Sequence, residues 1–409
     1  MQSRTRDTTT LAVGSVLSGL LAYLFFALTT RALGAAEAAP VSMLWTYWTF
    51  AAAALSFPLQ HWIAQSAASQ GGTGAVARAM PRLLQVVLLV TVLSMLVAWL
   101  FRSVLFHSDS WAYPVLVGVV TIGAAFIGVV RGGLTADHRF IALSITLVGE
   151  NGTRCVAAIL LIAAGDSSAF WYGFVLAAGS FIGAFWPSSY LFSRAASSGA
   201  GRASLRFLGG TASGQLIGQT VLTSGPVVLA FLGGTPGQIT SLFAALALFR
   251  APYQMALALV SRLTGFLTLL QVQADLARLT RVRRMLLAAV IVASPLAAAV
   301  GAWLGPWLLP IVFGDEVSLS AGLCAVIAVA STVALATLVA TVMVLAQARG
   351  GPLARSWLVA AGVGLLVAVV GPGAPLDRTV WAFLVAEVVA LVLLLLVHRV
   401  PGTPRSDEG

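Results

Sequence analysis

The amino-acid sequence predicts an all-α polytopic membrane protein, with about 12 transmembrane helices in two six-helix lobes around a central cavity. Of its 409 residues, 59% are hydrophobic and only 9% are charged, and the mean hydropathy is +0.97. Soluble proteins carry about 25% charged residues. Apolar stretches long enough to cross a bilayer, roughly 20 residues each, follow one another with short connections. This pattern leaves no room for a soluble domain.

The apolar stretches define twelve spans. They are residues 10–31, 40–62, 83–106, 111–131, 141–164, 168–193, 207–232, 238–262, 285–312, 319–347, 354–372 and 379–398. The two longest connections, 63–82 and 263–284, each follow the second span of a group of six. Leucines alternate with polar residues along 263–284, which predicts an amphipathic helix on the inner leaflet; a solvated basic loop is the alternative.

The distribution of arginine predicts the orientation. All 23 basic residues are arginine; eighteen, including Arg131, fall in segments on the side of the N-terminus, three fall on the other side and two fall within spans. Cytoplasmic loops carry the excess of positive charge, so we expect both termini in the cytoplasm. Because these arginines sit in short loops beside lipid, the basic balance predicts contact with membrane lipids and no nucleic-acid partner.

The two halves of the chain resemble each other. A stretch from Leu33-Gly34 to Phe50 matches one from Leu232-Gly233 to Phe249 at a constant offset. Six spans per half is an even number, so both halves start on the same side. This predicts parallel repeats related by an axis along the membrane normal, with a site at their interface. The predicted domains are a first lobe at 1–193, a cytoplasmic linker at 194–206, a second lobe at 207–398 and a cytoplasmic tail at 399–409.

Four charged residues lie within predicted spans, where a charge costs about 2.5–3.5 kcal/mol and normally faces a bundle interior. Glu150 and Arg154 are four residues apart on one helical face, with Asn151 between them. They form either a self-neutralised pair that locks packing or part of a cavity. Arg250 has no acidic neighbour in its own helix and needs water, an anionic ligand or a remote acid. Glu387 is either that counter-ion or a protonatable coupling site.

Two polar stripes follow four-residue spacing. The seventh span carries Thr211, Gln215, Gln219 and Thr223, and the first span carries Thr10, Gly14 and Ser18. Hydrogen bonding between helices explains such stripes. A hydrated groove for sugar hydroxyls, with both stripes on one central cleft, is the other interpretation.

Aromatic residues, glycines and histidines add further constraints. The aromatic run Trp45, Tyr47 and Trp48 predicts an interfacial belt, with sugar stacking as the alternative. The glycines at 71–74 have neither a following Walker lysine nor a preceding strand, so no nucleotide cofactor is expected. The four histidines are scattered and form no metal-ligand cluster. No outer loop is large and no catalytic constellation stands out, so we expect a protein that is not an enzyme.

A family resemblance rests on the turn Thr30-Arg31-Ala32-Leu33-Gly34, the aromatic run through Phe50, and residues 60–65. The chain resembles the multidrug/oligosaccharidyl-lipid/polysaccharide (MOP) flippase superfamily, in particular its bacterial polysaccharide-exporter branch, in which an R-x-L-G turn after the first span is common. The likeness covers nearly the whole chain. It implies a bacterial cytoplasmic (inner) membrane protein whose two lobes form a V around a cavity and work by alternating access. The short outer loops depart from the family pattern.

The resemblance implies a flippase or exporter of a polyprenyl-diphosphate-linked sugar or related polysaccharide precursor. Arginines of a cationic cavity would bind the diphosphate, and the candidate substrate-binding residues are Arg154, Arg250, Arg31, Gln215, Gln219 and Asn151. The candidate ion-coupling residues are Glu150 and Glu387. Glycosyltransferases or a polymerase of the same pathway are candidate partners. The alternative is a proton- or sodium-coupled exporter of small amphiphiles or drugs. The sodium-coupled drug branch usually has an acid in its first span, and span 10–31 has none.

Overall fold

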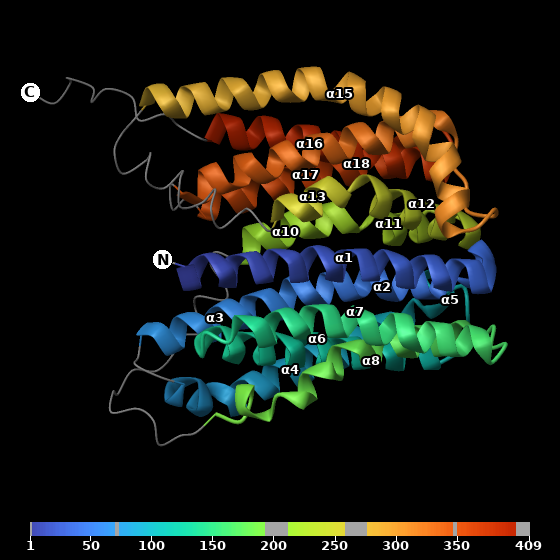
Figure 1. The fold of residues 1–409 in the computed structure, drawn as a ribbon. Helices are drawn as coiled ribbons and strands as arrows, with labels where there is room; N and C mark the ends of the chain where they lie inside the picture. Colours follow the sequence, from blue (N-terminus) through green and yellow to red (C-terminus); the bar gives the residue numbers. More distant parts are fainter. Residues whose placement is uncertain (1, 70–72, 193–211, 258–275, 347–349, 398–409) are drawn as a thin grey trace, which may run out of the picture. The chain divides into compact units, whose positions relative to one another are not determined.

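The computed structural model describes residues 2–69, 73–192, 212–257, 276–346 and 350–397, and these form helices joined by short connections (Figure 1). The predicted linker at 194–206 and the predicted tail at 399–409 lie outside the described residues. So does 263–275 of the predicted amphipathic helix, whose remaining residues, 276–284, are the first turns of a long continuous helix.

The elements of the first half are α1 (Gln2–Glu37), α2 (Ala39–Ala51), the π-helical turn η1 (Ala52–Ser56), α3 (Phe57–Ser69), α4 (Gly74–Leu100), α5 (Arg102–Leu105), α6 (Ala112–Ala136), α7 (Phe140–Ala163), α8 (Ala169–Ala178) and the 3₁₀ turns η2 (Gly179–Phe185) and η3 (Pro187–Ser189). Those of the second half are α10 (Ala212–Thr223), α11 (Gly225–Phe231), α12 (Pro236–Phe249), α13 (Ala251–Leu257), α15 (Leu276–Phe313), α16 (Ala321–Ala346), α17 (Gly350–Val370) and α18 (Pro375–Val397).

Eight of the described helices are long and apolar enough to cross a membrane. The predicted second, sixth, seventh and eighth spans are instead broken into shorter helices. The second contains the π-helical turn η1, and the sixth passes from α8 into 3₁₀ turns. The last two are interrupted before Pro226 and near Pro252, because proline has no amide hydrogen for the helical ladder. Each predicted span thus corresponds to one helix or one run of helices, as expected for a multi-pass membrane protein.

The chain divides into two compact units. The first unit comprises residues 1–212, 226–244 and 309–318, and the second comprises 213–225, 245–308 and 319–409. The division therefore does not follow the halves of the sequence strictly, because two segments of the second half pack into the first unit. Two of its boundaries, near residues 244 and 308, fall inside the continuous helices α12 and α15.

Helix α6 is the centre of the first unit. It contacts α2, α3, α4, α7 and α8, and 78% of its most apolar window is buried. Gly128 permits a close approach, since a Cβ there would lie 2.7 Å from the backbone of Ser56 in η1. Helix α1 runs along α7 (Figure 1) and leaves Val13, Leu17 and Leu20 on an exposed apolar face.

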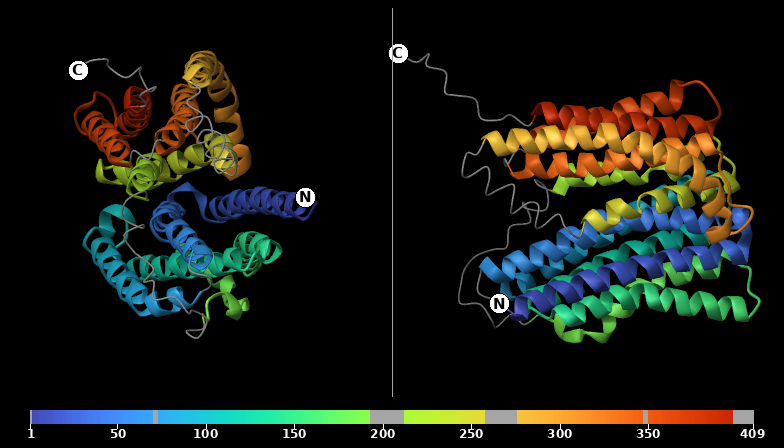
Figure 2. Two further views of the ribbon diagram at one scale, coloured as in Figure 1. Left: turned by 90° about the vertical axis from the view of Figure 1, so that its left-hand side faces the viewer. Right: turned by 45° about the horizontal axis from the view of Figure 1, so that its top comes forward.

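The second unit is built around α18, which packs against both α16 and α17 (Figure 2). Its apolar core includes Val344, Trp357 and Leu394. Gly218 of α10 lies directly over the Trp357 ring, where a Cβ would be 2.8 Å from the indole. On α15, only 6% of the most apolar window is buried, which suits a helix whose side chains face lipid.

The backbone supports the predicted repeat. Gly34 and Gly233, which the sequence match pairs, both have left-handed φ angles, 77° and 83°. Glycine adopts this conformation without steric cost. Each glycine precedes a paired helix, α2 or α12. Between these helices, Ser42 Oγ donates a hydrogen bond to Thr240 Oγ1 at 3.4 Å.

Candidate functional site

A buried ionic cluster in the first unit centres on Glu150. Arg154 Nη2 contacts Glu150 Oε1 at 2.9 Å, which is the i,i+4 pair that the sequence predicted. Arg131 Nη2 of α6 contacts Glu150 Oε2 at 2.6 Å, and Ser180 Oγ of η2 donates to Glu150 Oε1 at 2.7 Å. Glu150 is buried, and its partners come from its own helix and from two other elements. The cluster therefore ties α6, α7 and η2 together.

Arg154 uses its whole guanidinium group within this cluster. Its Nε donates to Leu176 O at 3.0 Å and its Nη1 to Asn151 Oδ1 at 2.8 Å. The guanidinium also lies 4.9 Å from the centre of the Trp48 ring. Gly179 makes room for it, since a Cβ there would be 2.5 Å from Arg154 Nε. With a side-chain exposure of 0%, Arg154 fits the packing interpretation better than the cavity-lining one.

Asn151 also acts between helices. Its Nδ2 donates to Ser18 O and Ser18 Oγ of α1, at 3.2 and 3.0 Å. One turn earlier on α1, Gly14 packs against Ser144 of α7, close enough that a Cβ would be 2.9 Å away. The small polar stripe of the first span thus faces α7, and the interhelical interpretation explains it. Small residues and interhelical hydrogen bonds are common where membrane helices meet.

Arg131 lies in a different place from the one that the sequence pattern predicted. The predicted span ended at Arg131, and this arginine was counted with the segments on the cytoplasmic side. In the structure α6 continues to Ala136, and the glycines allow tight contacts: Gly132 with Ile63 and Gly133 with the Ser189 carbonyl. Arg131 is 8% exposed, and its Nε has no hydrogen-bond partner among the described residues. Its charge leaves this cluster with two cations for one carboxylate.

The second unit holds a different buried acid. Glu387 of α18 is 1% exposed, and neither of its carboxyl oxygens has a hydrogen-bond partner within the described part of the chain. Thr337 of α16 lies alongside and donates to the main-chain carbonyl of Glu387 at 3.4 Å. The Arg250 guanidinium lies 4.5 Å from the centre of the Phe383 ring, one helical turn before Glu387.

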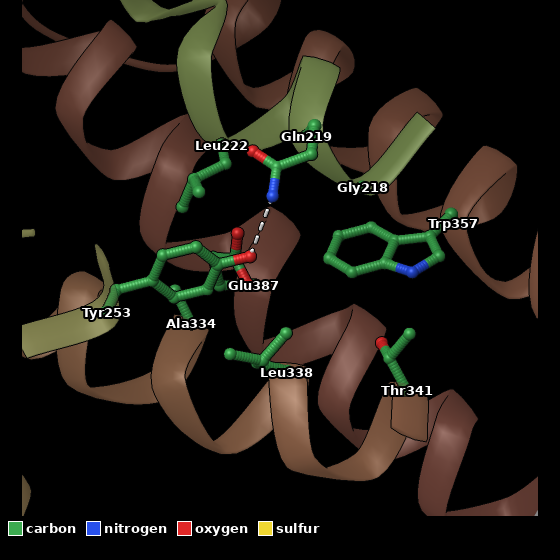
Figure 3. Close-up of a pocket in the computed structure, with 9 residues that line it drawn as sticks. All are labelled: Gly218, Gln219, Leu222, Tyr253, Ala334, Leu338, Thr341, Trp357 and Glu387. Atoms are coloured by element: carbon green, nitrogen blue, oxygen red, sulfur yellow. Dashed lines mark hydrogen bonds between the residues drawn. The ribbon is translucent and has the colours of Figure 1, made fainter. Parts of the chain in front are cut away.

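Glu387 lines a pocket of about 30 Å³ in the second unit (Figure 3). Gln219 Nε2 donates to the Tyr253 hydroxyl across it at 3.1 Å. Two other lining groups, Thr341 Oγ1 and Trp357 Nε1, are buried with no hydrogen-bond partner among the residues described. A buried water needs about 10–15 Å³ and two to four polar partners. The pocket therefore has the size and the polar groups for one or two waters or a small cation.

The remaining predicted residues are distributed as follows. Gln219 lies in the Glu387 pocket, whereas Thr211 and the side chain of Gln215 lie outside the described residues. Arg31 is at the end of α1, where its Nε donates to Val312 O of α15 at 3.1 Å. The predicted aromatic belt is wrong for Trp45, which is 8% exposed and packs beside Phe25 and Phe243. A hydrophobic run gives no sign of which residues face lipid and which face other helices.

Tyr253, Thr341 and Trp357 line the pocket without any feature in the sequence that predicts this role. They come from α13, α16 and α17, and each looks ordinary within an apolar helix. Of these three residues, Tyr253 alone has a notable sequence feature nearby. It lies three residues after Arg250 and one after Pro252, at a break in the eighth span.

Comparison with known proteins identifies the fold. No protein-family model and no curated protein matches the chain. Among solved structures, an inward-facing MATE multidrug transporter of the MOP superfamily covers 96% of this chain and 96% of its own, with a TM-score of 0.67 and 14% identity. The lipid II flippase MurJ, in an inward closed conformation, covers 94% of this chain and 86% of its own, with a TM-score of 0.69 and 13% identity. An outward-facing MATE transporter covers 95% and 94%, with a TM-score of 0.60 and 15% identity. The chain thus has the fold of MOP-superfamily transporters, as the resemblance predicted.

Proposed function

We propose that the protein is a flippase or exporter that moves a polyprenyl-diphosphate-linked sugar, or a related polysaccharide precursor, across the cytoplasmic membrane by alternating access. The fold it shares with the MATE transporters and the lipid II flippase MurJ supports transport as the class of function. The two-repeat architecture supports a substrate site between repeats.

The observation that carries the choice of an anionic substrate is the balance of buried charge. In the described first unit, the buried charged residues are Arg131, Arg154 and Glu150, which sum to one net positive charge. The single buried acid is bonded to both arginines. An excess guanidinium in this unit suits a diphosphate. Arginine binds phosphate oxygens through charge-assisted hydrogen bonds.

Arg131 is the proposed diphosphate contact in the first unit, and Arg250 of the second unit remains the other candidate from the sequence. Arg131 is the member of the ionic cluster with residual exposure and an unused Nε donor among the described groups. Glu150 and Arg154 act through it, because Glu150 fixes the Arg131 guanidinium and Arg154 offsets the second carboxylate oxygen. We therefore assign Glu150 and Asn151 a positioning role. Gln219 and Glu387 belong to the coupling site described next.

Glu387 is the proposed coupling residue. A carboxylate buried without hydrogen bonds is costly unless a proton or a cation neutralises it. The adjoining pocket supplies the Tyr253 and Thr341 oxygens and room for a small ligand. Binding and release of a proton or a sodium ion at Glu387 would drive the transport cycle. The glycines at 71–74 lack the Walker lysine of a nucleotide-binding loop, which agrees with energy taken from an ion gradient.

The test of the substrate is a binding comparison. The purified protein in nanodiscs should bind a polyprenyl-diphosphate-linked sugar at least tenfold more tightly than the uncharged polyprenol of equal chain length. Arg131→Ala and Arg250→Ala should each weaken binding about tenfold, the loss expected for a charge-assisted contact. Arg139→Ala is the matched control, because Arg139 is exposed and donates to Ser188. Equal binding of polyprenol and the diphosphate would refute the anionic substrate.

A second candidate, an ion-coupled exporter of cationic amphiphiles, is favoured by one feature of the same pocket. Trp357 and Tyr253 place aromatic rings beside a buried acid, and the faces of aromatic rings attract cations. Binding of a fluorescent lipophilic cation that is lost in Glu387→Gln and unaffected by Arg131→Ala would support this function over the lead.

A further inference from the structure

Contacts within the first unit join the repeats at one end of the helices. This is the end that the arginine distribution assigns to the outside. The first-half partners lie after the first and third spans. The second-half partners lie in segments 226–244 and 309–318, which belong to the same compact unit. The contacts fall into two groups, which we call the charged latch and the neutral latch.

The charged latch consists of Arg31, Gly34, Ala35 and the end of α15 with Glu316. Arg31 donates from Nε to Val312 O at 3.1 Å and from Nη2 to Ile311 O. The last carbonyls of a helix lack intrahelical partners and favour a cation. In return, Glu316 Oε2 accepts from the amide of Ala35 at 2.8 Å. Each side thus caps a helix end of the other.

Gly34 creates the amide that Glu316 binds. Its φ of 77° interrupts α1, and a new turn starts where Ala38 N donates to Gly34 O. Ala35 N therefore lies at the beginning of a helical segment, where a negative charge is stabilised. A Cβ on residue 34 would lie 2.7 Å from the Glu316 carboxylate, so only glycine admits this contact.

The neutral latch repeats the arrangement with the halves exchanged. His107, in the connection after the third span, donates from Nε2 to Gly234 O at 3.2 Å. Gly234 follows Gly233, the left-handed glycine that the sequence repeat pairs with Gly34. Phe101 and Phe231 add an edge-on ring contact at 5.2 Å. In each latch, the left-handed glycine turn of one half meets the connection after the third span of the other half.

Aromatic rings and one hydroxyl pair lie between the same segments. Phe26 stands 4.7 Å from Phe243 and 5.4 Å from Phe313, measured between ring centres. Ser42 and Thr240, both 0% exposed, are joined by the 3.4 Å hydrogen bond. These groups exclude water while the latches are closed.

We propose that the two latches are repeat-related locks on the outer end of the bundle, and that both must open for a substrate to leave on that side. This role rests on the alternating-access function proposed for the protein. Opening exposes the main-chain groups of both latches and the aromatic rings to water. The charged latch is the stronger of the two, because its hydrogen bonds carry a charged partner and those of the neutral latch do not.

The experiment measures how often the outer end opens. Ser42→Cys is placed on a Cys155→Ala/Cys324→Ala background, and intact cells are treated with a membrane-impermeant maleimide. Modification of residue 42 requires an open outer end. Arg31→Gln and Glu316→Gln should each raise its rate about tenfold, the effect of losing a charge-assisted hydrogen bond. His107→Ala should raise it about three- to fivefold. The double variant Arg31→Gln/His107→Ala should show the product of the two factors.

Matched controls lie beside each latch residue. Arg102→Gln is the arginine control, since Arg102 contacts Trp99 and Asp109 in its own connection. Asp315→Asn is the acid control, next to Glu316. Equal modification rates for Arg31→Gln, Glu316→Gln and these controls would overturn the proposal.

Two further measurements distinguish opening of the latches from unfolding of the protein. Cys155 is 4% exposed. When this cysteine is put back into each variant, it should stay unmodified, because only unfolding exposes it. The pair Ser42→Cys/Thr240→Cys should form a disulfide under oxidant, and Arg31→Gln should lower its yield; an unchanged yield argues against the latches. The modification rates of residue 42 could change as expected although the protein binds no diphosphate lipid. That result would support the latches and reject the proposed substrate.

Discussion

The two buried glutamates, Glu150 and Glu387, are both 1% exposed and yet have opposite environments. Glu150 is bonded to two arginines and a serine from its own and neighbouring elements. Glu387 has no hydrogen-bond partner for its carboxyl group among the described residues and faces a small polar pocket. Burial alone therefore does not mark a transport residue. The set of partners separates an acid that holds helices together from an acid that is available to a ligand.

Removing the Glu150 carboxylate from the ionic cluster should have the largest effect on stability. Glu150→Ala leaves two buried guanidinium groups without their acid, and removing one partner of a buried pair costs about 3–5 kcal/mol. We expect a large loss of folded protein and a strong fall in the melting temperature, measured by fluorescence size-exclusion after heating. Asp109→Ala, which removes an exposed ion pair at 3.9 Å, should leave the melting temperature unchanged. Equal stability of the two variants would mean that Glu150 is not structural.

Neutralising Glu387 should leave folding intact and stop the coupling of transport to an ion gradient. Glu387→Gln removes only the titratable and ion-binding group, so we expect the melting temperature to change by less than the equivalent of about 1 kcal/mol. Gradient-driven transport in proteoliposomes should fall at least tenfold, about 1.4 kcal/mol. Imposing the proton and sodium gradients separately identifies the ion. Full transport by Glu387→Gln would mean that Glu387 is not the coupling residue.

The hydrogen bonds of Asn151, which join the ionic cluster to α1, should contribute less to stability than Glu150 does. Asn151→Leu loses its hydrogen bonds to Ser18 and Arg154. Each such bond contributes about 0.5–1.5 kcal/mol, so we expect a destabilisation of about 1–3 kcal/mol in thermal unfolding. If Asn151 instead binds substrate, Asn151→Leu will show normal stability and weaker ligand binding.

The smallest effect is expected in the pocket beside Glu387. Gln219→Leu removes the hydrogen bond to the Tyr253 hydroxyl, which is worth about 1 kcal/mol, and frees that hydroxyl beside Glu387. We expect a several-fold change in the apparent ion affinity for transport and little change in the melting temperature. Thr220→Val, an exposed neighbour on α10, serves as the control. A Gln219→Leu protein with unchanged ion dependence would place the coupling step elsewhere.

Prediction from the sequence reached as far as regular spacing and local chemistry allow. It included the spans, the Glu150–Arg154 pair and the repeat that matches Gly34 with Gly233, because each of these is encoded within one helix or at one offset. It missed Arg131 and Ser180 as partners of Glu150, and Tyr253 beside Glu387. Those partners come from helices whose rotation about their own axes is set by packing, and a uniformly apolar helix carries no periodic signal of that rotation.

The ionic cluster also explains why an intramembrane arginine was an ambiguous sign. Arg154 and Arg131 lie in the same cluster, yet Arg154 donates to four acceptors, whereas the Nε of Arg131 has no partner in the part of the chain described. The i,i+4 spacing identified Arg154 as the conspicuous residue. The more available charge, on Arg131, lay at the predicted end of a span and was counted with the cytoplasmic segments.

The continuous helices α12 and α15 each belong to both compact units, with their divisions near residues 244 and 308. Two of the divisions between the units thus fall inside a continuous helix, where bending can occur only as curvature of that helix. Helix α15 contains Pro295, Pro306 and Pro310, each of which removes one rung of the backbone ladder and lowers the resistance to flexing. Helix α15 is therefore the easier of the two helices to bend, since α12 has a proline only at its first residue.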